Sequence, residues 1–131
     1  MIDIEADIFD AVYPYLENLV PAGGFVSEYV PAPAKLPHVS MMEIDNVPDA
    51  ETRDSGHHEY SSIVTYEAQV FATSRAALRA IAVALDDAMV GKMGFTKTMG
   101  QQIPNLADVS VHRYVARFRR GVDNQKNLYR P

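Results

Sequence analysis

Residues 59–72 read EYSSIVTYEAQVFA and carry the strongest secondary-structure signal in the chain. Apolar and polar side chains alternate along the second half of this stretch, and this period of two is typical of a β-strand with one buried face. The residues predicted to face the core are Val64, Tyr66, Ala68 and Val70. Thr73 or Ser74 then offers a side-chain oxygen that can cap a following helix.

An amphipathic helix is predicted directly after this strand. Its apolar stripe recurs at helical spacing and consists of Leu78, Ile81, Ala82, Leu85, Ala88 and Met89. The stripe leaves Arg75, Arg79 and Asp86 outside, and Gly91 and Gly94 are expected to end the helix. The sequence therefore predicts a strand followed at once by a helix that covers the sheet.

The N-terminal side of this unit is predicted to hold one helix and two strands. The helix is predicted from the spacing of Ile4, Ile8, Val12, Leu16 and Leu19. Pro14 is expected to kink or split this helix, because proline lacks a backbone donor. Strands are predicted at residues 25–30 and 38–46. Residues 47–58 (VPDAETRDSGHH) show no period and predict a long mobile loop.

Two more strands are predicted on the C-terminal side, at residues 95–103, interrupted at Gly100, and at residues 110–122. In the longer strand, the core face is expected to carry Tyr114, Ala116 and Phe118. The opposite face is expected to carry Arg113, Val115, Arg117 and Arg119. Residues 124–131 are predicted to form a loose polar tail.

The predicted fold class is α+β, with a mixed, mainly antiparallel sheet packed against two helices and a long mobile loop. With 131 residues, the chain is expected to form one domain over residues 1–131. A hydrophobic content of 47% and a charged content of 22% are typical of a globular protein and argue against general disorder.

Composition and charge exclude several classes of function. The absence of cysteine excludes a disulfide framework, a thiolate zinc site, an iron–sulfur cluster and a cysteine nucleophile. No apolar run is long enough for a transmembrane helix, and the acidic N-terminus is unlike a secretory signal, so we expect an intracellular product without a membrane partner. The net charge of −5 disfavours a dedicated nucleic-acid-binding protein.

Side chains that could carry catalysis or bind a metal do not form a recognisable motif. His57, His58 and Glu59 are adjacent, so on a strand the two imidazoles would point to opposite faces. Asp86 and Asp87 diverge by about 100° on a helix. We therefore expect no enzyme activity, no cofactor and no metal site.

Several segments resemble the small tail terminator proteins of long-tailed bacteriophages, also called tail completion or minor capsid proteins. The similarity spans residues 8–123 and is carried by PHVS (37–40), EIDN (43–46), EYSSIVTYEAQVF (59–71), MGFTK (93–97) and VHRYVARF (111–118). The resemblance implies a virion protein of the head–tail junction, assembled in the host cytoplasm. It implies a homo-oligomeric ring, generally a hexamer, that caps the tail tube protein and meets the head through a neck or head-completion protein. DNA would only pass through its channel.

Two alternatives to this function stay open on the sequence alone. One is a head-completion or neck connector subunit of the same assembly. The other is a small α+β enzyme or ligand-binding module, which a stable monomer with a deep apolar pocket would favour.

Charge is unevenly distributed along the chain and predicts how copies could associate. Residues 1–34 contain six acids and no base, whereas residues 110–131 contain six bases and one acid. A ring needs a contact between two unlike surfaces, so we expect the C-terminal arginines to meet the acids of a neighbouring subunit. The residues predicted for this interface are Arg113, Arg117, Arg119, Glu43, Asp45, Asp49, Glu51 and Asp54. The alternative is that the arginines pair within their own subunit or face the DNA channel.

Overall fold

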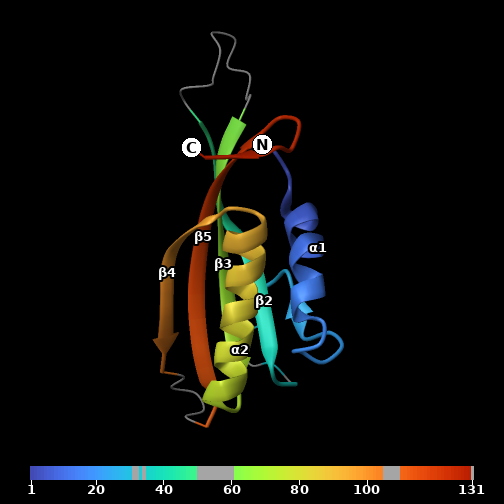
Figure 1. The fold of residues 1–131 in the computed structure, drawn as a ribbon, viewed down its shortest axis with the longest axis vertical. Coiled ribbons are helices and arrows are strands. Elements are labelled where there is room, and N and C mark those ends of the chain that lie inside the picture. Colours follow the sequence, from blue (N-terminus) through green and yellow to red (C-terminus); the bar gives the residue numbers. More distant parts are fainter. Residues whose placement is uncertain (31–32, 34, 50–60, 105–109, 131) are drawn as a thin grey trace.

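The computed structural model describes residues 1–30, 33, 35–49, 61–104 and 110–130 (Figure 1). In chain order, its elements are α1 (Glu5–Leu16), β1 (Phe25–Val26), β2 (His38–Pro48), β3 (Ser61–Ala72), α2 (Arg75–Asp86), the π-helical turn η2 (Asp87–Lys92), β4 (Thr96–Ile103), β5 (His112–Asp123) and β6 (Leu128–Tyr129). The order of these elements confirms the predicted α+β class.

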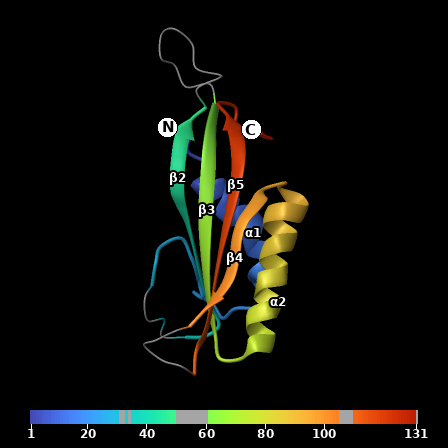
Figure 2. The same ribbon diagram turned by 90° about the vertical axis from the view of Figure 1, so that its left-hand side faces the viewer.

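The strands form one six-stranded sheet in the order β1-β2-β3-β5-β4, with β6 paired to the end of β5. Every pairing is antiparallel except the short parallel contact between β1 and β2, so the sheet is mixed and mainly antiparallel as predicted. Helices α1 and α2 lie on the same face of the sheet (Figures 1 and 2).

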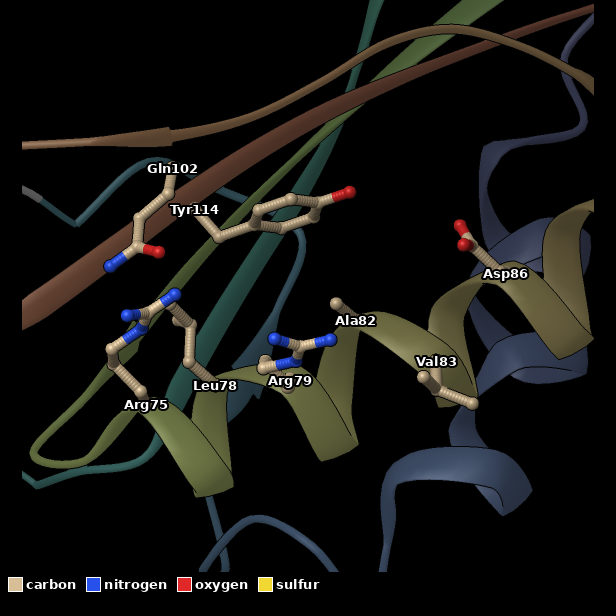
Figure 3. A pocket seen from close by; sticks show the side chains of 8 residues that line it. All are labelled: Arg75, Leu78, Arg79, Ala82, Val83, Asp86, Gln102 and Tyr114. Atoms are coloured by element: carbon tan, nitrogen blue, oxygen red, sulfur yellow. The ribbon is translucent and has the colours of Figure 1, made fainter.

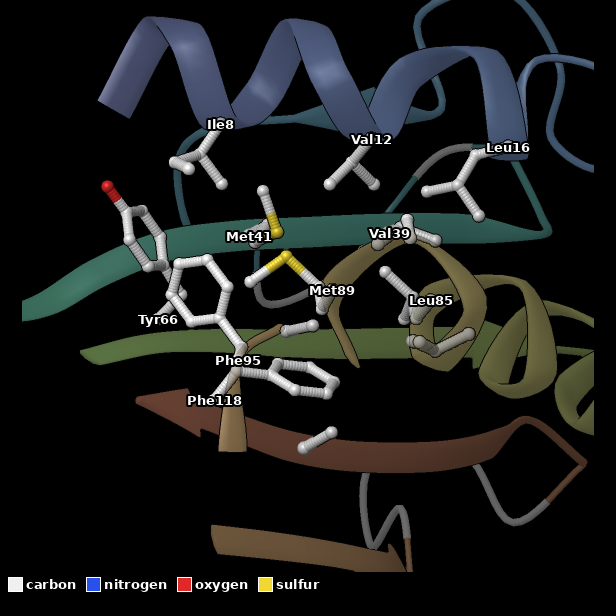
Figure 4. Close-up of a cluster of buried hydrophobic side chains, with 14 of the residues drawn as sticks. Ile8, Val12, Leu16, Val39, Met41, Tyr66, Leu85, Met89, Phe95 and Phe118 are labelled. Carbon is white, nitrogen blue, oxygen red and sulfur yellow. The ribbon is translucent and has the colours of Figure 1, made fainter. Parts of the chain in front are cut away.

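The hydrophobic core fills the space between the two helices and the sheet (Figure 4). The helices contribute Ile4, Ile8, Val12 and Leu16 from the α1 region and Leu78, Ile81 and Leu85 from α2. The strands contribute alternate residues, among them Val39, Met41, Val64, Tyr66, Ala68, Val70, Ala116 and Phe118. Burial of one large apolar side chain contributes about 1.5–3 kcal/mol to stability. The apolar stripes of the helices and the alternate apolar residues of the strands are therefore buried against each other, and this burial holds the helix layer on the sheet.

The first helix continues through Pro14 and ends at Leu16, so the predicted split is wrong. Pro14 and Asp10 are both exposed, and water can therefore satisfy the Asp10 carbonyl that the proline ring leaves without an N–H. Leu19 lies beyond the helix and is 36% exposed, so it does not extend the buried stripe.

Helix α2 begins where its cap was predicted, because the Ser74 hydroxyl accepts a hydrogen bond from the backbone N–H of Ala77 (3.1 Å). After Asp86, the backbone continues as the π-helical turn η2. Gly94, with a φ of +70°, follows the end of this turn. Gly94 therefore ends the helix as predicted, whereas Gly91 lies inside η2 and does not stop it. The last turn is wider than an α-helical one.

Several strand boundaries differ from the prediction. Strand β1 has only two residues, and β2 continues to Pro48, two residues into the predicted loop. Asp49 follows the strand, and residues 50–58 of the predicted loop lie outside the described residues. Strand β4 is not interrupted at Gly100, because its register shift lies between Lys97 and Met99. The predicted loose tail contains β6, which pairs with β5.

Candidate subunit interface

The predicted arginine strip lies on the face of β5 that points away from the helices. Arg113, Arg117 and Arg119 pair across the sheet with residues of β3 on this same face. Ala116 and Phe118 point the other way and are fully buried. The alternation of β5 therefore positions the arginines as the sequence predicts.

Two of these arginines belong to a hydrogen-bonded chain within the subunit. The Nε of Arg117 donates to Oε2 of Glu67 at 2.8 Å, and Oε1 of Glu67 accepts from Nε2 of Gln69 at 2.8 Å. Arg113 donates from Nη2 to the side-chain oxygen of Gln69 at 2.8 Å, and its guanidinium lies 5.7 Å from the ring of Phe71. This is the pairing within one subunit that the sequence left open as an alternative.

The exposure of the pair between Arg117 and Glu67 limits its energetic value. The side chain of Arg117 is 46% exposed, and that of Glu67 is 12% exposed. An ion pair with one partner in solvent contributes about 0–1 kcal/mol. The pair therefore orients Arg117 along its own sheet more than it stabilises the fold.

Arg119 is exposed and makes no ion pair with the part of the chain that the structure describes. It lies opposite Thr65, which in turn lies opposite Asp45 of β2. Asp45, Thr65 and Arg119 therefore form one row across the same face of the sheet, and Asp45 and Arg119 are both exposed. Neighbouring strands are about 4.8 Å apart, so two such spacings separate the two charged residues. The sheet thus brings together charges that are far apart in the sequence.

The other predicted acids have different surroundings. Glu43 faces the helix side, where Oε2 accepts from the Tyr66 hydroxyl (2.6 Å) and Oε1 accepts from Nδ2 of Asn46 (2.8 Å). Burial, together with the hydrogen bond to Glu43, raises the pKa of Tyr66 far above its usual range. Asp49 accepts a hydrogen bond from the Tyr129 hydroxyl at 2.9 Å. The remaining two, Glu51 and Asp54, lie outside the described residues.

The structure also shows a groove between α2 and β4 that the sequence analysis did not identify (Figure 3). Its volume is about 280 Å³, and it is lined by Arg75, Leu78, Arg79, Ala82, Val83, Asp86, Gln102 and Tyr114. The one available signal was the position of Val83, an apolar residue on the same side of the predicted helix as Arg79.

Lys97 contacts two of the residues that line this groove, Asp86 and Tyr114. Its Nζ donates to Oδ2 of Asp86 at 3.1 Å and lies 5.4 Å from the ring centre of Tyr114. Burial alone would lower the pKa of Lys97, but the hydrogen bonds to Tyr114 and Asp86 outweigh it and raise that pKa. A Cβ on Gly100 would lie 2.5 Å from Cε of Lys97, so glycine makes room for this arrangement.

Other side chains considered for chemistry do not assemble into a centre. Within residues 1–30, 33, 35–49, 61–104 and 110–130, no group of three metal-ligating side chains comes together. His57 and His58 lie outside these ranges. Asp86 binds Lys97, whereas Asp87 is exposed on the next turn. No described helix is long and apolar enough to cross a membrane.

Comparison with known proteins shows a similar fold among solved structures. The sequence matches no family model and no curated protein. Among solved structures, the fold is similar to that of a chain in the virion of a native gene transfer agent particle, with a TM-score of 0.59 and 20% sequence identity. The similarity covers 85% of this chain and 90% of that chain. It shows that the two chains share nearly their whole fold.

Proposed function

We propose that this protein is a structural component of a phage-like virion, where it closes the end of the tail tube as a ring and joins the tail to the head. The observation that carries the proposal is the fold shared over 85% of the chain with a virion protein. The finer assignment to the tail end rests on the resemblance of residues 8–123 to tail terminator proteins.

A ring, with six subunits expected from the resemblance, requires each subunit to offer two unlike surfaces. The tail tube protein and a neck or head-completion protein would be the other partners, and DNA would pass through the opening. The protein would reside at the head–tail junction of the virion. Its role would be assembly, with no catalytic step and no cofactor.

Deletion of the gene from the genome that encodes the particle tests this function. We expect filled heads and separate tails of abnormal length, because tube growth would lack its terminator. Electron microscopy of lysates measures both features, and expression of the wild-type gene from a plasmid should restore joined particles. Normal particles from the deletion strain would refute the proposal. Unjoined tails of normal length would instead support a neck or head-completion role.

The contact predicted from the sequence, between the arginine strip of one subunit and the acids of the next, stays a prediction. Arg117→Glu would also break the bond to Glu67, so its effect on assembly would mix two causes. Arg119→Glu is the cleaner test, because Arg119 is exposed and lacks an ion pair among the described residues. Loss of assembly that an Asp45→Arg change restores would support this contact.

A further inference from the structure

Helix α2 has a neighbouring helix on only one of its two sides. Helix α2 packs against α1 on one side, whereas its other side borders the groove over β4 and β5. Arg75 and Arg79 reach into this groove from α2, and the ring of Tyr114 lies across from them (Figure 3). Val83 is 59% exposed on the same helix. The groove thus combines apolar walls with two cations toward one end and with Asp86, which is paired to Lys97, at the other (Figure 3).

The outer face of α1 has the complementary composition. It consists of Ala6, Asp10, Tyr13 and Glu17, all of which are exposed and spaced three or four residues apart. Tyr13 is 48% exposed and lies between Asp10 and Glu17 on this face. A helix rises 1.5 Å per residue, so the acids lie about 4.5 and 6 Å along the axis from Tyr13.

Four charged residues lie on these two surfaces: Arg75 and Arg79 at the groove, and Asp10 and Glu17 on α1. None of them makes an ion pair with a described residue of its own subunit. In contrast, Arg117, Lys97 and Lys126 have acidic partners within the subunit. Two cations beside an apolar groove and two anions beside an exposed tyrosine are therefore left for contacts outside the subunit.

We propose that the groove between α2 and β4 receives the outer face of α1 from a second copy of this chain. The inference rests on the proposed ring and names the surfaces that would close it. Tyr13 of one copy would enter the groove beside Val83 and Tyr114 of the next, and Glu17 would approach Arg75 and Arg79. The two surfaces lie on different helices, so the contact is heterologous and repeats around a ring.

The direction of the helices supports this contact. The C-terminal end of α1 and the N-terminal end of α2 lie at the same end of the molecule (Figure 1). A rotation about an axis parallel to the long direction of the molecule keeps both ends at that level. Glu17, at the end of α1, would then meet the arginines of the first two turns of α2.

Cysteine pairing tests the contact directly, because the natural chain contains no cysteine. Tyr13→Cys and Val83→Cys proteins, mixed in equal amounts and oxidised, should form a disulfide-linked dimer. A double variant should give a ladder of bands whose top band counts the subunits. As a matched control, Arg119→Cys, on the other face of the sheet, should form no dimer with Tyr13→Cys. Dimers with Arg119→Cys but none with Val83→Cys would overturn the inference.

Charge reversal gives a second, independent readout. Arg79→Glu should raise the concentration needed for half-assembly about tenfold, equivalent to about 1.4 kcal/mol, because an attraction becomes a repulsion. Adding Glu17→Arg should restore assembly, and circular dichroism should show that every variant is folded. If rings form but neither charge reversal nor cysteine pairing involves these residues, the inference fails and the proposed function stands. If the protein forms no ring alone or on tail tubes, both fail.

Discussion

At the scale of single residues, Gly94 and Arg120 show how one backbone conformation holds a turn in place. Gly94 has a φ of +70°, and Nη1 of Arg120 donates to its carbonyl at 2.8 Å. A Cβ on Gly94 would lie 3.1 Å from Cζ of Arg120. The next residue, Phe95, is buried and packs edge-on against Tyr66 with ring centres 5.8 Å apart. The turn therefore positions an aromatic side chain of the core.

We expect Gly94→Ala to lower the free energy of unfolding by about 1–2 kcal/mol, because the left-handed conformation is strained for alanine. Urea denaturation followed by circular dichroism measures this change. Gly91→Ala is the matched control, since the nearest atom to its Cβ would be 3.9 Å away. In η2 that change should be neutral or stabilise by about 0.5–1 kcal/mol. Equal losses in both variants would contradict the role of the positive φ.

His38 predicts a pH dependence of stability. It is 5% exposed, and burial lowers its pKa below 6.5. The unfolded chain therefore binds the proton more readily, and stability should fall as the pH drops through 6.5 toward the lowered pKa. His38→Gln should flatten this part of the profile, measured as the urea midpoint between pH 7 and 5. An unchanged slope would show that another group causes the loss.

At the scale of elements, β6 converts the C-terminal segment into part of the sheet. Tyr129 lies opposite Gly121, and a Cβ on Gly121 would come within 2.7 Å of the Tyr129 ring. The hydroxyl of Tyr129 donates to Oδ2 of Asp49 at 2.9 Å, eighty residues earlier in the chain. Leu128 packs against the core. One short strand thus links the C-terminal region to the end of β2.

Loss of the contacts that the Tyr129 side chain makes should loosen this link. We expect Tyr129→Phe to lower the free energy of unfolding by about 0.5–1.5 kcal/mol, because the hydrogen bond to Asp49 is lost. Tyr129→Ala should cost more, because it also uncovers Gly121, and hydrogen exchange should increase at the end of β5. Arg130→Ala, at an exposed neighbour, serves as the control. Unchanged exchange in Tyr129→Ala would mean that β6 does not protect β5.

At the scale of the whole molecule, the charge separation of the sequence is partly cancelled within the subunit. The Nζ atom of Lys126 lies 3.4 Å from Oδ2 of Asp7 in α1. Arg117 forms an ion pair with Glu67 of β3. Fewer charged side chains are therefore left without a partner among the described residues than the charge distribution of the sequence suggests. Those left include Arg75 and Arg79 at the groove and Asp10 and Glu17 on the outer face of α1. Electrostatic steering between copies would therefore depend on a few exposed pairs.

If such pairs guide assembly, salt should affect its rate more than its final extent. We expect the initial rate, followed by light scattering, to fall as ionic strength rises from 0.05 to about 0.5 M, where charges are screened beyond about 4 Å. The amount assembled at equilibrium should change less, because apolar contacts supply most of the strength. A rate independent of salt would exclude charge steering.

The elements and their buried faces follow from local sequence patterns. The period of two in residues 59–72 and the helical spacing from Leu78 to Met89 predicted β3, α2 and the sides they bury. These patterns are local, because the period of the strand or helix alone determines the face on which each side chain lies. The resemblance to tail terminator proteins was read from the same segments, and the comparison of structures supports it only as far as a fold shared with a virion chain.

The partners of the charged residues depend on how distant segments align. Arg117 meets Glu67 fifty residues away because β5 pairs with β3 in one register, and Glu43 meets Tyr66 for the same reason. The groove exists because α2 packs along the sheet mainly against β3 and β5, and this packing between layers is encoded by no local pattern. Strand register and layer packing are set by the summed burial of the whole core, so these features arise only when the chain is folded.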